Sequence, residues 1–70
     1  MKVNGKDMEL KGTKTLDKLL DELQINKDKV VVELDGEIIT KESFAEIVLK
    51  NSNVMEVISF VGGGWYEGLY

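Results

Sequence analysis

The sequence contains no cysteine, no histidine, no proline and no arginine. Without cysteine the chain can form neither a disulfide nor a thiolate zinc site, and it has no cysteine nucleophile. Without histidine it lacks the usual general base and the commonest protein ligand for transition metals. No pair of carboxylates has the spacing or the apolar setting that acid–base catalysis requires. The sequence therefore lacks the groups that most often supply acid, base or nucleophile in an active site.

Basic charge is also scarce, since nine lysines stand against 13 acidic residues and the net charge at pH 7 is −4. Nucleic acid binding depends on clustered Lys and Arg, and Arg is the commonest reader of base edges. No apolar stretch approaches the roughly 20 residues that a helix needs to cross a bilayer. The first residues, 1–4, leave no room for a signal peptide. We therefore expect a cytoplasmic protein that binds neither nucleic acid nor membranes.

The length of 70 residues allows one domain with one small core. A hydrophobic content of 43% favours a folded domain over a disordered chain. At this size we expect a stability of only about 3–5 kcal/mol.

Turn and helix signals divide the first part of the chain into a hairpin and a helix. Asn4-Gly5 predicts a tight turn between a strand at 1–3 and a second strand at 7–11, because both residues tolerate a positive φ. Thr15 is the expected N-cap of the helix that follows. One apolar helical face is formed by four leucines at the required spacing, Leu16, Leu19, Leu20 and Leu23.

The second part of the chain is rich in strand signals. Residues 30–34 are mostly β-branched, and Asp35-Gly36 predicts a turn into a strand at 37–39. A helical turn is expected at 41–44, a short strand or irregular crossing at 45–49, and a last strand at 54–61. The order of elements predicts an α+β fold of the ubiquitin-like β-grasp type. Its mixed sheet would have four to five strands packed on one main helix, and another small α+β roll is the alternative.

Alternation sorts the last strand into two faces. Glu56 is not expected to be buried without a partner, so its face should be the solvated one. Ile58 and Phe60 would then be exposed apolar groups, and with Val61 they form a candidate docking surface beside the glycines. Alternatively, the segment 45–49 or the C-terminal segment covers them. The first face would hold Met55, Val57, Ser59 and Val61, and the second Val54, Glu56, Ile58 and Phe60.

Three consecutive glycines, Gly62, Gly63 and Gly64, follow this strand. Glycine loses the most backbone freedom on ordering, so a glycine run makes a poor strand and a poor helix. We interpret Gly62 and Gly63 as a thin, flexible lead into a partner's active site. The last six residues, 65–70, differ from the rest because they hold three of the five aromatic residues.

Residues 1–64 resemble the ThiS family, the sulfur carriers of thiamine biosynthesis. The glycine end after a strand, in a chain of this length, is the specific part of the resemblance. The other pieces are common turn and helix motifs. The resemblance rests on Asn4-Gly5-Lys6, Leu16 with Leu19-Leu20, Ile38-Ile39, Lys41-Glu42 and Phe60-Val61-Gly62-Gly63-Gly64.

The resemblance implies a β-grasp fold and a carrier mechanism. A ThiF-type adenylating enzyme would use ATP to activate the carboxylate of Gly64, and sulfur would then replace AMP to give a thiocarboxylate. Thiazole synthase (ThiG) would accept that sulfur. The chain would bind no cofactor itself, since ATP would be used by the activating partner. Related carriers for molybdopterin or another metabolite share this chemistry and remain alternatives.

The chain departs from the family pattern at residues 65–70, because the family usually ends at its glycines. The carbonyl of Gly64 is tied into a peptide bond with Trp65, so it cannot be adenylated in this form. We therefore divide the chain into a carrier domain, 1–64, and an aromatic extension, 65–70. The extension would be a pro-segment removed by a protease or an added expression segment. Alternatively, the chain is a non-catalytic ubiquitin-like interaction module that keeps it.

Overall fold

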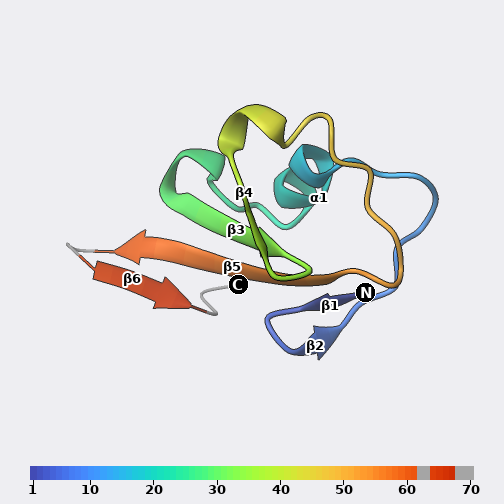
Figure 1. The fold of residues 1–70 in the computed structure, drawn as a ribbon, viewed down its shortest axis with the longest axis horizontal. Coiled ribbons are helices and arrows are strands. Elements are labelled where there is room, and N and C mark those ends of the chain that lie inside the picture. Colours follow the sequence, from blue (N-terminus) through green and yellow to red (C-terminus); the bar gives the residue numbers. More distant parts are fainter. Residues whose placement is uncertain (62–63, 68–70) are drawn as a thin grey trace.

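The computed structural model describes residues 1–61 and 64–67, and from residue 60 onward it describes the backbone only (Figure 1). The helical elements are α1 (Leu16–Glu22) and two short 3-10 helices, η1 (Lys27–Lys29) and η2 (Lys41–Ser43). The strands are β1 (Lys2–Val3), β2 (Lys6–Asp7), β3 (Val30–Leu34), β4 (Glu37–Ile39), β5 (Val54–Val61) and β6 (Gly64–Glu67).

The strands form one mixed sheet in the order β2-β1-β5-β3-β4, and β6 pairs with β5 in addition. Strand β1 runs parallel to β5, whereas the other pairs are antiparallel. Helix α1 and η2 lie on the same side of this sheet (Figure 1). This arrangement confirms the predicted α+β architecture, a mixed sheet on one main helix. Strand β6 is an additional strand that the sequence did not predict.

The core lies between α1 and one face of the sheet. Leu16, Leu19 and Leu20 are buried, as their helical spacing predicts, while Leu23 is half-buried at the end of the stripe. Burial of one leucine side chain contributes about 1.5–3 kcal/mol, so these three leucines supply a large share of what holds the domain together. They belong to one cluster with buried sheet residues Val3, Val32, Leu34, Met55 and Val57.

The second strand is shorter than predicted. Residues 7–11 were expected to form it, but β2 ends at Asp7. After a bond from the Met8 backbone N–H to the Met1 carbonyl (2.8 Å), the chain leaves the hairpin. The Leu10 backbone N–H then donates to the side chain of Asn51 at 3.0 Å. The alternation of Met8 and Leu10 therefore reflects burial along an extended loop and not pairing in the sheet.

The segment expected to be a short strand or irregular crossing, 45–49, forms one isolated bridge, Thr15 with Val48. Its backbone is bonded to the start of the helix, since the Leu16 N–H donates to the Ile47 carbonyl at 2.9 Å. This crossing brings buried Phe44 and Leu49 into the core.

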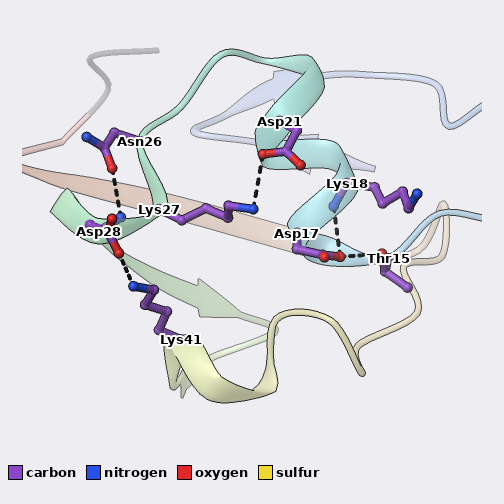
Figure 2. A network of polar contacts seen from close by, with 8 residues as sticks. All are labelled: Thr15, Asp17, Lys18, Asp21, Asn26, Lys27, Asp28 and Lys41. Atoms are coloured by element: carbon purple, nitrogen blue, oxygen red, sulfur yellow. Dashed lines mark hydrogen bonds and ion pairs between the residues drawn. The ribbon is translucent and has the colours of Figure 1, made fainter.

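Polar contacts join α1 to the two 3-10 helices (Figure 2). Lys27 pairs with Asp21 at 3.1 Å, and Lys41 pairs with Asp28. The Asp28 backbone N–H donates to the Asn26 side chain at 2.9 Å, which caps η1. The Lys41–Asp28 pair is exposed and the Lys27–Asp21 pair is partly exposed. We therefore expect each pair to contribute little to stability.

The first turn of α1 is organised differently from the predicted cap. Thr15 is the N-cap residue, but its hydroxyl donates to the Asp17 carboxylate instead of accepting from the helix backbone. The same carboxylate oxygen accepts the Lys18 backbone N–H at 2.9 Å (Figure 2). The hydrogen bond from Thr15 is the main cause that lowers the pKa of Asp17 below its ordinary value of 3.8.

We expect Thr15→Val to raise the pKa of Asp17 back toward 3.8, because it removes the hydroxyl donor. A carboxyl pKa that is lower in the folded than in the unfolded chain stabilises the fold at pH values above 3.8. That contribution is lost as the pH falls through the lowered pKa. The measurement is an NMR titration of the Asp17 carboxyl carbon. Thr13→Val is the matched control on an exposed threonine, and equal titration curves for both variants would contradict the assignment.

Candidate functional site

Strand β5 positions the glycine run. It is the central strand, paired with β3 from Leu34–Met55 to Val30–Ser59 and with β1 at its beginning. Residues 60 and 61 of β5 therefore extend beyond Ser59, the last residue of β5 that pairs with β3. The hairpin of β5 and β6 projects from the body of the domain (Figure 1).

The two faces of β5 are partly as predicted. Met55 and Val57 are buried in the core, whereas Val54 on the other face is exposed, which confirms the assignment of faces for these residues. Ile58 is half-buried and not fully exposed, because it has backbone neighbours on both sides, Val31 of β3 and Glu67 of β6. The predicted docking residues Phe60 and Val61 belong to β5, but their side chains lie outside the described residues.

The face of the sheet opposite the helix carries two exposed apolar residues, of which Val54 was predicted to be exposed and Ile38 was not. Ile38 is 61% exposed and Val54 is 48% exposed. The register places Ile38 opposite Glu33, and Glu33 opposite Glu56. The exposure of Ile38 depends on the register of β4 against β3, which alternation alone does not fix.

Glu33 and Glu56 are directly opposite each other across β3 and β5. Like charges at opposite positions repel, so this pair costs stability. It also gives the sheet face opposite the helix, called the open face below, an acidic centre. One carboxylate oxygen of Glu56 is buried without a hydrogen-bond partner in the described part of the chain. The expectation that Glu56 lies on the solvated face is thus only partly met, since the residue is half-buried.

Asn4 determines where β1 stops covering β5. Its backbone N–H donates to the Met55 carbonyl at 2.9 Å, and its side-chain oxygen accepts the Val57 backbone N–H at 2.8 Å. The positive φ of 51° that the Asn4-Gly5 turn imposes on Asn4 lets one residue make both contacts. The sequence analysis identified Asn4 as a turn residue only and missed this link across the sheet.

The residues after the glycine run pair with β5. Val61 is opposite Gly64, Phe60 opposite Trp65, and Ile58 opposite Glu67. Gly64, the predicted sulfur-carrying residue, therefore lies at the start of strand β6 and not at a free end. The predicted flexible lead, Gly62 and Gly63, lies outside the described residues.

A metal site and a membrane-spanning helix each require features that the described residues do not contain. Residues 1–61 and 64–67 contain no group of His, Cys, Asp or Glu that could hold a metal ion. None of the helices in these ranges has the length and apolar character needed to cross a membrane.

Comparison with known proteins identifies relatives along almost the whole chain. The model of the ThiS family matches residues 1–64. The sulfur carrier protein ThiS of Bacillus subtilis (strain 168) is 42% identical over 65 residues, covering 91% of this chain and 98% of that protein. A crystal structure of the thiamine biosynthesis protein ThiS from Geobacter metallireducens matches with a TM-score of 0.76 at 33% identity, covering 90% of this chain and 96% of that chain.

A larger protein also contains a similar segment. The thiazole synthase of Paramagnetospirillum magneticum (strain ATCC 700264 / AMB-1) is 34% identical over 62 residues, which cover 89% of this chain. The chain spans only 19% of the length of that protein. The similarity therefore concerns one segment of the synthase and not its whole length.

Proposed function

This chain belongs to the ThiS family of sulfur carriers, and from that premise we propose that it carries sulfur as a thiocarboxylate on Gly64 for synthesis of the thiamine thiazole ring. The observation that carries the proposal is the family match over residues 1–64, which ends at the last of the three glycines. The chain is a protein substrate of other enzymes and not a catalyst itself. The similarity to part of a thiazole synthase supports the thiazole ring as the destination of the sulfur.

The proposed chemistry takes place at one carboxylate. A carboxylate oxygen of Gly64 attacks the α-phosphorus of ATP and releases pyrophosphate, which gives an acyl adenylate. Hydrosulfide (HS⁻) from the sulfur source then attacks the carbonyl carbon and expels AMP, and loss of the S–H proton leaves a thiocarboxylate. Adenylation is needed because a carboxylate is a poor electrophile and AMP is a good leaving group. A ThiF-type adenylating enzyme would bind the ATP, so the chain itself needs no cofactor, and thiazole synthase (ThiG) would take the sulfur.

The proposal requires a carboxylate on Gly64, and therefore loss of residues 65–70. A protease that cuts after Gly64 would supply it. Glycines without Cβ atoms suit a narrow channel because partner backbone can approach them closely. The partners would dock beside this end, on Ile58, Phe60 and Val61, with the exposed Ile38 and Val54 extending the contact over the open face.

The test uses the chain that ends at Gly64. Incubated with a ThiF-type enzyme, ATP and a sulfur source, it is expected to gain first the mass of an adenylate and then that of an oxygen-to-sulfur exchange. Intact mass spectrometry resolves both products. If an enzyme that is competent on its own carrier produces neither, the proposal is wrong.

The pairing of β6 with β5 favours a second candidate function, a non-catalytic ubiquitin-like interaction module that retains residues 65–70. The two candidates differ in the mass of the protein isolated from its own cells. A terminus at Gly64 supports the carrier, and a terminus at Tyr70 supports the module.

A further inference from the structure

We propose that the edge of β5 at Ile58–Val61 is a strand-addition site, which the segment Gly64–Glu67 closes in the uncut chain. Removal of residues 65–70 opens this edge to an extended segment of a partner protein. The inference rests on the proposed function only for the place of the cut, after Gly64. The edge itself is a property of the described sheet.

The edge exists because β1 is much shorter than β5. Strand β5 spans eight residues and β1 only two, and β1 is opposite Val54 and Met55 alone. Asn4 extends this coverage as far as the backbone N–H of Val57 through its side chain. In the described residues, the register of β1 provides no partner for β5 beyond Met55, and Asn4 reaches no farther than Val57.

The direction of the backbone groups shows which residues form the edge. Met55 and Val57 bond toward Asn4, whereas the Val54 carbonyl accepts the Asp35 N–H at 2.8 Å on the opposite edge. Successive residues of a strand direct their N–H and C=O groups to opposite edges. Ser59 and Val61 therefore present theirs on the Asn4 side, away from β3.

Strand β6 demonstrates what this edge accepts. Ser59 is opposite Tyr66 and Val61 is opposite Gly64, both in antiparallel register. An added strand gains affinity from such main-chain hydrogen bonds, and an edge without a partner invites pairing with another chain. Without residues 65–70, the Ser59 backbone groups lose their partner at Tyr66.

One cut would thus change two properties at once. It frees the carboxylate of Gly64, and it uncovers the strand edge next to that carboxylate. A partner that adds a strand here distinguishes the processed chain from the precursor before any chemistry begins. A second copy of this chain is a poor occupant, because the chain that ends at Gly64 keeps nine lysines and, without Glu67, 12 acidic residues, and two copies with a net charge of −3 each repel one another.

The test is amide hydrogen exchange, followed by NMR on the full chain and on the chain that ends at Gly64. We expect the Ser59 amide to exchange at least about tenfold faster in the shorter chain, because it has lost its cross-strand partner. The Val57 amide is an internal control in the same strand. It should stay equally protected in both, since its acceptor is the Asn4 side chain.

Two proline variants of the full chain distinguish the effect of losing the β5–β6 pairing from the effect of removing residues 65–70. Tyr66 faces Ser59 in the ladder, so Tyr66→Pro removes the N–H that donates to the Ser59 carbonyl. Loss of this bond weakens the pair and should speed exchange of the Ser59 amide, whose own acceptor is the Tyr66 carbonyl. The N–H of Glu67 faces away from β5, so Glu67→Pro is the matched control and should leave Ser59 protected. Equal Ser59 exchange in the two variants would overturn the proposal.

The partner half of the proposal is tested with a synthetic peptide of residues 64–70. Added to the chain that ends at Gly64, it should restore protection of Ser59, and it should not bind the full chain. If the peptide does not restore protection of Ser59, the edge does not accept a separate strand and this part of the proposal is wrong. It is also wrong if Ser59 is already protected in the shorter chain because that chain dimerises, which sedimentation would detect. None of these measurements uses ATP or sulfur, so their outcome is independent of whether Gly64 forms a thiocarboxylate.

Discussion

A chain that ends at Trp65 is expected to remain unmodified under conditions in which a chain that ends at Gly64 becomes thiocarboxylated. One added residue is enough, because it turns the Gly64 carboxylate into an amide. Adenylation needs a carboxylate oxygen as the nucleophile that attacks ATP. Once Gly64 is joined to Trp65 by a peptide bond, Gly64 has no carboxylate to react. The only terminal carboxylate is then on a residue with a large side chain, which a channel shaped for glycine would exclude.

The measurement is the intact mass of three chains, ending at Gly64, Trp65 and Tyr70, after incubation with the same activating enzyme, ATP and sulfur source. Only the first is expected to change mass. A circular dichroism spectrum of each chain controls for folding. An adenylate on the chain that ends at Trp65 would show that the enzyme does not require glycine, and would remove the need for a cut directly after Gly64.

Leu20→Ala is expected to leave a large fraction of the protein unfolded at 25 °C. Leu20 lies in the middle of α1, is fully buried and contacts the core cluster under the sheet. Removing a buried leucine side chain costs about 2–5 kcal/mol, including the cavity that remains. A domain of this size has only about 3–5 kcal/mol in total, so the loss is comparable to the whole stability.

Urea unfolding followed by circular dichroism measures this effect, with the loss seen as a lower midpoint or as no folded baseline. Lys18→Ala is the matched control, since it shortens an exposed residue of the same helix. It should change the free energy of unfolding by less than about 0.5 kcal/mol. A Leu20→Ala midpoint equal to that of Lys18→Ala would contradict the role of Leu20 in the core.

The sequence predicted best the elements whose signals are local. The leucine spacing that begins at Leu16 identified α1 and its buried face, because helical periodicity requires no knowledge of partners. The β-branched run at 30–34 and the strand at 54–61 were found with the observed bounds. The order of these elements was enough to indicate a β-grasp fold, since few small folds place a helix between two hairpins.

The missed features depend on contacts between distant residues. The exposure of Ile38 follows from the register of β4 against β3, which alternation cannot supply. The bond from Val57 to Asn4 joins residues 53 positions apart. Strand β6 was missed because it begins at Gly64, a residue of low strand propensity, whereas pairing with an edge that β1 leaves uncovered outweighs that propensity.

The position of β5 in the sheet has a consequence for the order of folding. The hairpins β1–β2 and β3–β4 are complete early in the chain, but in the described sheet they share no partner except β5. The parallel pairing of β1 with β5 closes a loop of about fifty residues, and such long-range pairing slows folding. During synthesis the two hairpins therefore cannot join in one sheet until Val54–Val61 has been made. We expect the complete sheet to form in one late step, when β5 pairs with both hairpins.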